Sequence, residues 1–249
     1  MSGHSKWSQI KRSKGVADVK RGQVFTKLGR ELAVAVREGG PSPDANARLR
    51  LAVDRARAAN MPADTIERAI KRAAGGEEGV QFSEIVYEGY GPGGAALMVE
   101  VLTDNRNRAV AEIRNAFNRG GGSLGETGCV AWLFDQRGVI SIDANGSDPD
   151  ELSLQAIDAG AEDVQAEDGS VEVYTAPTEL ESVRAALAKD GAHIVGAELA
   201  MVPKTQVALD AKEAASNLRL MERLEDLDDV QKVYSNLEIS EEALAAYEQ

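Results

Sequence analysis

The alternation of strand and helix patterns between residues 138 and 202 is the feature that most constrains the fold. Short apolar runs typical of strands lie near residues 139–142, 164–166, 171–174 and 194–201, and patterns typical of helices lie near 149–159 and 177–189. The resulting order, βαββαβ, is that of the ferredoxin-like fold, in which two helices pack on one antiparallel sheet. We therefore predict an α+β domain over residues 137–202.

The segments before and after this domain are predicted to form a single domain together. Strands are predicted at 82–90 and 95–102, a helix from Asp104 or Asn105 to Phe117, and an apolar strand at 129–134. Beyond Pro203 the pattern predicts a strand at 206–209, a helix at 212–227, a strand at 230–237 and a short acidic helix within 240–249. Residues 77–136 and 203–240 are thus predicted to form a second ferredoxin-like α+β domain, into which residues 137–202 are inserted.

Residues 1–76 are predicted to form a small, basic, all-helical domain. Apolar residues recur at helical spacing over 16–38, where Gly39-Gly40 and Pro41 end the first helix. A second helix follows Asp44 as its cap and runs to residue 60, and a third begins at Pro62 and runs to residue 75. The predicted fold class is α+β with three domains.

Charge is distributed unevenly along the chain, whose formal net charge is −13. Residues 1–74 hold 16 basic and 7 acidic side chains, a net charge of +9, whereas the remaining residues hold 12 basic and 34 acidic ones, a net charge of −22. A basic end on an acidic chain is the electrostatic pattern expected of a protein that binds a polyanion. A solvated basic face without a partner is the alternative.

The basic residues define a predicted nucleic-acid-binding set. Phosphate contacts are predicted for Lys6, Lys11, Arg12, Lys14, Lys20, Arg21 and Lys27 near the N-terminus. Arg48 and Arg55 flank the apolar face of the second helix and present their charged ends to solvent. Trp7 lies among the first group, where it either stacks on an exposed base or anchors the basic segment on the helical domain. Arg106 and Arg108 lie on the helix after Asp104 together with Arg114 and Arg119; a solvated helix face is the alternative there.

The residues that catalysis or metal binding needs are scarce, so we predict no catalytic residue, no metal site and no cofactor. Two histidines and one cysteine exclude a zinc cluster and an internal disulfide, and Cys129 lies in an apolar run, as expected of a buried side chain. The glycines at 120–125 match a dinucleotide-binding spacing but follow a helix rather than a strand. The acidic residues at 225–229 lack the spacing of a calcium loop and are interpreted as a solvated helix end.

Hydropathy and cysteine content bear on location. No run approaches the roughly 18 apolar residues that a membrane-spanning helix needs, and the N-terminus has no apolar signal region. A single cysteine fits a reducing compartment. We expect a cytoplasmic protein without a membrane partner.

Several longer motifs resemble those of the YebC/PmpR family. Three motifs resemble the opening of that family: GHSKW at 3–7, KRG at 20–22 and FTKL at 25–28. Three others resemble its central signature: TDNRNR at 103–108, GSLGETG at 122–128 and VAW at 130–132. NMP at 60–62, IERAI at 66–70 and the glycine turn at 87–94 are similar as well. The resemblance covers essentially the whole chain and begins at residue 3, which leads us to expect a bacterial member without a presequence.

The resemblance carries expectations about fold and function. It implies one helical and two α+β domains, no enzymatic activity and no required cofactor. Members are described as DNA-binding transcriptional regulators; a mitochondrial relative activates translation of cytochrome c oxidase subunit I, and bacterial relatives are linked to ribosomes stalled on proline-rich stretches. We therefore expect a non-enzymatic, nucleic-acid-binding regulator of gene expression that acts on DNA, the alternative being a ribosome-associated translation factor that binds ribosomal RNA. No small-molecule substrate is expected.

Overall fold

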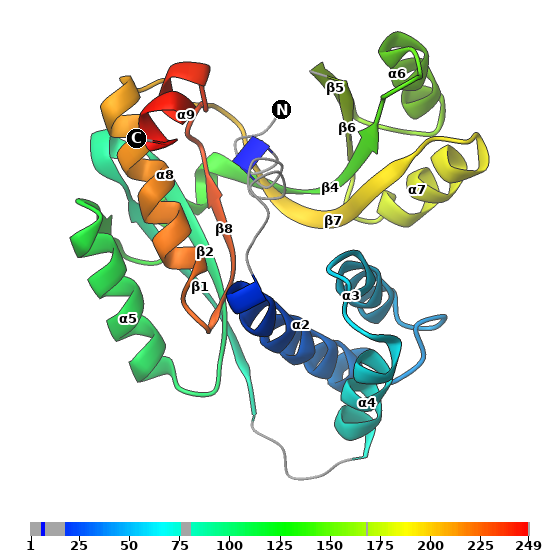
Figure 1. The fold of residues 1–249 in the computed structure, drawn as a ribbon, viewed down its shortest axis with the longest axis horizontal. Helices are drawn as coiled ribbons and strands as arrows, with labels where there is room; N and C mark the ends of the chain where they lie inside the picture. The colour runs from blue at the N-terminus through cyan, green and yellow to red at the C-terminus, as the bar shows by residue number, and fades with distance from the viewer. Residues whose placement is uncertain (1–5, 8–17, 76–80, 168, 249) are drawn as a thin grey trace. The chain divides into compact units, whose positions relative to one another are not determined.

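The computed structural model describes residues 6–7, 18–75, 81–167 and 169–248, with the side chains of residues 18–20 left aside. The described chain forms two compact units, one comprising Phe134–Val202 and the other comprising the rest (Figure 1). The α+β class is confirmed, because helices and two four-stranded sheets make up these units. The predicted boundaries of three domains stay a prediction.

Three helices begin the larger unit: α2 (Asp18–Gly39), α3 (Ala47–Ala58) and α4 (Ala63–Ala74). They share an apolar core that includes Leu32, Leu49 and Ile66. The side chain of Asn46 caps α3 by accepting a hydrogen bond from the Leu49 amide, so the prediction of Asp44 as the cap is wrong by two residues. The side-chain amide of Asn46 also donates hydrogen bonds to the Ala35 and Gly40 carbonyls, which connects the start of α3 to the end of α2.

The sheet of the larger unit has the strand order β3-β1-β2-β8. Its strands are β1 (Ser83–Tyr90), β2 (Ala96–Thr103), β3 (Ser123–Leu124) and β8 (Val230–Ser235), and each neighbouring pair is antiparallel. Helices α5 (Arg106–Arg119) and α8 (Ala211–Glu225) pack side by side on one face of this sheet (Figure 1). Phe117, Leu218 and Val99 are fully buried between the helices and the sheet. The acidic helix α9 (Glu241–Glu248) packs on α8.

The smaller unit confirms the predicted βαββαβ order. It contains β4 (Phe134–Asp143), α6 (Pro149–Asp158), β5 (Asp163–Glu167), β6 (Ser170–Thr175), α7 (Leu180–Lys189) and β7 (Ile194–Pro203). The strand order β5-β6-β4-β7 places the first and third strands of the motif at the centre of the sheet, as in the ferredoxin-like fold.

Two strand predictions are wrong. Residues 129–133 form a turn followed by a 3-10 helix, Ala131–Leu133, because the Glu88 carboxylate accepts the backbone N–H groups of Gly128, Val130 and Ala131 that a strand ladder would use. Residues 206–209 form only an isolated bridge between Val207 and Leu237. Asp210 directly follows, and its side chain caps α8, so the extended segment ends there.

Candidate nucleic-acid interface

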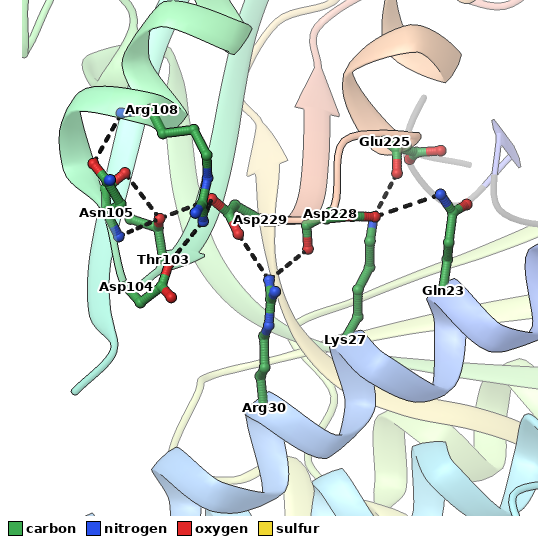
Figure 2. A network of polar contacts seen from close by, with 10 residues as sticks. All are labelled: Gln23, Lys27, Arg30, Thr103, Asp104, Asn105, Arg108, Glu225, Asp228 and Asp229. Carbon is green, nitrogen blue, oxygen red and sulfur yellow. Dashed lines mark hydrogen bonds and ion pairs between the residues drawn. The ribbon is translucent and has the colours of Figure 1, made fainter. Parts of the chain in front are cut away.

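One face of α2 contacts the loop between α8 and β8 (Figure 2). Gln23, Lys27 and Arg30 lie four and three residues apart, so their side chains lie on the same side of the helix. The Lys27 ammonium donates to the Glu225 carbonyl, and the Arg30 guanidinium donates to the Asp228 carbonyl at 2.8 Å. Lys27, predicted to contact phosphate, therefore holds α2 on the α+β part of this unit in the structure.

Asp229 is the centre of this contact. Its side chain is almost fully buried, at 3% exposure, and its Oδ1 atom accepts from Arg30 at 2.8 Å. Its Oδ2 atom accepts from Arg108 and from the Thr103 hydroxyl, both at 2.8 Å. One carboxylate thus joins an arginine of α2 to an arginine of α5. The interpretation of this acidic segment as a solvated helix end is wrong at Asp229.

The pKa of the Asp229 carboxyl reflects this arrangement. Burial by itself raises that pKa, but the hydrogen bonds from Arg108 and Thr103, together with the charges of Arg108 and Arg30, outweigh it and bring the pKa below its ordinary value. Asp229 is therefore ionised at neutral pH despite its burial. Arg108 also pairs with Asp104 at 2.7 Å, and the two carboxylates raise the pKa of its guanidinium further above its ordinary value.

Trp7 is buried rather than exposed. Its indole N–H donates to the Glu225 carboxylate at 3.2 Å, and its ring meets the Tyr247 ring edge-on with 5.5 Å between centroids. The side chain belongs to the apolar core that α5 and α8 form with the sheet. The anchoring alternative therefore describes Trp7 in this structure, but the anchor lies in the α+β part of the unit and not in the three-helix core. Stacking on a base would require this side chain to leave its core.

The two predicted arginines of α3 also have intramolecular partners. Arg55 pairs with Glu31 of α2 at 2.6 Å, and both side chains are partly buried. Arg48 contacts the carboxylates of Glu38 and Glu84, the second of which lies on β1. Like Lys27 and Arg108, these residues hold structural elements together, which sequence reasoning did not anticipate.

The other predicted residues divide into two groups. The side chains of Lys11, Arg12, Lys14 and Lys20 lie outside the described part of the chain, whereas Arg21 is exposed on α2 and Lys6 is half-buried beside Trp7. Arg106 is exposed at the first residue of α5, and within the described residues no ion pair involves it. The same holds for Arg114 and Arg119, farther along α5.

The described residues hold neither a cluster suited to a metal ion nor a helix suited to span a membrane. Within the described residues, no group of three or more histidine, cysteine, aspartate or glutamate side chains is placed to hold a metal ion. None of the helices in that part of the chain is long and apolar enough to cross a membrane.

Comparison with known proteins assigns the chain to a family. Residues 5–76 match the model of the TACO1/YebC protein N-terminal domain, and residues 82–237 match that of the TACO1/YebC second and third domain. A "Probable transcriptional regulatory protein" of Trichlorobacter lovleyi is 57% identical over 96% of this chain and 97% of its own length. One of the same description from Roseiflexus castenholzii is also 57% identical, over 97% of each chain.

A solved structure agrees in fold and in sequence. The crystal structure of a conserved hypothetical protein, Aq1575 from Aquifex aeolicus, superposes with a TM-score of 0.83, covers 90% of this chain and 93% of its own, and is 48% identical. The family models together span nearly the whole sequence, and relatives above 50% identity extend over almost the entire chain. This chain therefore belongs to the TACO1/YebC family.

Proposed function

We propose that this protein is a non-enzymatic regulator of gene expression that binds nucleic acid, with DNA as its target in transcription and the cytoplasm as its place of action. The observation that carries the proposal is the charge separation of +9 in residues 1–74 against −22 in the remainder. The names of the similar proteins, which refer to transcriptional regulation, support it.

We propose phosphate contact for a smaller set of residues than the sequence alone suggests. Lys27, Arg48, Arg55 and Arg108 each contact acidic groups or carbonyls of the same unit, so their charges are already partly neutralised. We keep phosphate contact for the other basic residues of the predicted set, because the N-terminal segment is strongly basic and Arg106 is exposed at the start of α5. These are Lys6, Lys11, Arg12, Lys14, Lys20, Arg21 and Arg106.

Charge reversal tests the proposal. In one variant, Lys11, Arg12 and Lys14 are all replaced by Glu. The affinities of this variant and of the unaltered chain for a labelled DNA duplex are measured over a series of salt concentrations. We expect the slope of log affinity against log salt to fall by about 2.7, because each lost phosphate contact removes about 0.9.

A second triple variant separates a local effect from one of net charge. Lys189, Lys212 and Arg223 are exposed side chains of the acidic part of the chain, and their replacement by Glu changes the net charge by the same amount. We expect this control to bind DNA nearly as the unaltered chain does. Equal affinities for the chain and the N-terminal variant would refute the proposal.

The alternative target is ribosomal RNA, because phosphate contacts carry no information about base sequence. The basic residues at 6–21 would serve on a ribosome as they would on a duplex, with the acidic part of the chain facing ribosomal proteins. Sedimentation with ribosomes at moderate salt, lost in the N-terminal variant and retained in the control, would support this alternative. A preference for one promoter duplex would support the transcriptional role.

A further inference from the structure

Helix α5 has an outward face unlike the rest of the acidic part of the chain. Eight of its side chains are exposed, and each is arginine, asparagine or alanine: Arg106, Asn107, Arg108, Ala111, Arg114, Asn115, Asn118 and Arg119. Its one carboxylate, Glu112, is half-buried toward the side. The part of the chain that follows residue 74 has only 12 basic side chains, so these 14 residues carry four of them.

The amides form a stripe along this face. Asn107, Ala111 and Asn118 are spaced by four and seven residues, which places them in line on one side of a helix, with Arg114 beside them. A helix of 14 residues is roughly 21 Å long. The small side chain of Ala111 lies within the stripe, where it lets another molecule approach the helix axis closely.

The opposite face fixes α5 on its sheet. Ala109, Ile113 and Phe117 are buried against the sheet and α8. The Asn105 side chain caps the helix by accepting from the Arg108 amide, and the Arg108 side chain is held by Asp229. The outward face is therefore presented on a rigid support, as a surface that reads a ligand requires.

The guanidinium groups on this face are available. Among the residues that the structure describes, Arg106, Arg114 and Arg119 make neither a hydrogen bond nor an ion pair. Most arginines of α2 and α3 differ in this respect, as Arg30, Arg48 and Arg55 each have a carboxylate partner. A solvated helix in a chain of this composition would normally alternate basic and acidic residues, which this face does not.

We propose that the outward face of α5 lies in the major groove of duplex DNA and reads its base edges, with Asn107, Arg114 and Asn118 in contact with bases and Arg106 and Arg119 with phosphates. Asparagine pairs with the N6/N7 edge of adenine, and arginine pairs with the O6/N7 edge of guanine. The charge of the face complements phosphate on a body that otherwise repels it. This inference rests on the proposed function, because it supplies the sequence information that phosphate contacts of the N-terminal segment lack.

The shape of the surface favours DNA over duplex RNA. The major groove of B-form DNA is about 12 Å wide and admits an α-helix, whereas the major groove of A-form RNA is too narrow for side chains to read. A helix whose exposed residues run along its whole length, as those of α5 do, therefore fits the DNA groove.

The experiment begins with the full chain and a pool of random duplexes, from which bound sequences are selected and sequenced. The affinity for a selected duplex is then compared with that for a scrambled duplex and for an RNA duplex of the same sequence. We expect the unaltered chain to prefer the selected DNA at least tenfold. The double variant Arg114→Gln, Asn118→Ala should lose that preference, so that the two DNA affinities become equal, while it still binds both.

Two controls make each outcome decisive. Arg223 is exposed on α8, and Arg223→Gln removes the same charge from the neighbouring helix, so this variant should keep the full preference. A thermal melt equal to that of the unaltered chain shows that the double variant is folded. Failure of the unaltered chain to bind any duplex would overturn the proposed function as well. If it binds without preference, if the double variant keeps the preference, or if only RNA binding depends on α5, the α5 proposal alone is overturned.

Discussion

The Arg30 guanidinium and the Asp229 carboxylate lie 2.8 Å apart and join α2 to the loop that precedes β8. The pair is close to the core, with 21% and 3% of the two side chains exposed. Arg108 binds the other oxygen of the same carboxylate, so the two arginines share one buried negative charge (Figure 2). A buried charge is tolerated when its partners satisfy it and costs much when one is removed. The attachment of α2 therefore depends on Asp229 more than on any exposed acid nearby.

Replacing Asp229 by Asn should loosen this attachment. The amide keeps the shape of the side chain but not its charge, and hydrogen bonds to a charged group contribute about 2 kcal/mol each. We expect the urea midpoint to fall and the amides of α2 to lose protection against hydrogen exchange before those of β2. Asp228→Asn is the matched control, since within the described residues the Asp228 side chain accepts one long bond, at 3.4 Å, from Gln23 at the surface. Equal effects of the two substitutions would contradict the role given to Asp229.

The Glu88 carboxylate on β1 should make the stability of the fold depend on pH. Burial raises the pKa of Glu88, but hydrogen bonds from the Gly128, Val130 and Ala131 amides outweigh this and lower it below its ordinary value. A depressed pKa means that Glu88 contributes its full stabilisation above the pKa of an unfolded glutamate, about 4.3. That contribution is lost as the pH falls through the folded-state pKa.

Comparison of the unaltered chain with Glu88→Gln by urea unfolding between pH 7 and pH 3 measures this effect. We expect the variant to be less stable at pH 7. We expect the difference in unfolding free energy to narrow as the pH falls below about 4.3 toward the folded-state pKa of Glu88, because the unfolded chain then takes up a proton more readily than the folded one. If the difference in unfolding free energy between the two proteins stays constant over this range, the charge of Glu88 is not what orders residues 128–131.

Local sequence patterns were sufficient for most of the fold. Residues 138–202 gave the correct order of strands and helices, because each element has its own periodicity and the turns between them are short. The predicted strand at 129–134 failed for a reason that is not local. The backbone N–H groups of this segment donate to the Glu88 carboxylate, which lies about forty positions earlier in the chain. Nothing in the apolar run indicates this partner.

The candidate site was predicted less completely, again because partners are distant. Lys27 and Arg108 were expected to face nucleic acid, but their partners, Glu225 and Asp229, are 198 and 121 residues away. Charge counts show that a segment is basic without showing which cations are neutralised by folding. The exposed face of α5 was visible in the sequence only as a group of arginines; that Arg106, Arg114 and Arg119 remain without ion pairs required the structure of the described residues.

The two tryptophans offer a direct test of whether Trp7 stays in its core. Trp7 is fully buried, whereas Trp132 is 66% exposed. In the variant Trp132→Phe, we expect fluorescence at short wavelength that acrylamide quenches weakly, and we expect saturating DNA to leave it unchanged. Trp7→Phe should show red-shifted, readily quenched emission. A strong quench of the Trp132→Phe variant by DNA would show that Trp7 leaves the core to stack on a base.

Two glycine substitutions should change stability in opposite directions. A Cβ atom at Gly91 would lie 1.9 Å from the Asn217 side-chain oxygen. Asn217 cannot move aside, because its amide donates to the carbonyls of Pro92 and Glu213 at 2.8 and 3.0 Å. Gly91→Ala should therefore destabilise by about 1–3 kcal/mol, the usual cost of forcing extra volume into a packed site.

Gly29 lies within α2, and a Cβ atom there would meet nothing within 4 Å. Gly29→Ala should stabilise by about 0.5–1 kcal/mol, because alanine loses less backbone entropy when a helix forms. Urea unfolding of the two variants beside the unaltered chain measures both changes. If Gly91→Ala is neutral, the turn and Asn217 are not packed as described; if Gly29→Ala destabilises, another group approaches α2 closely at that position.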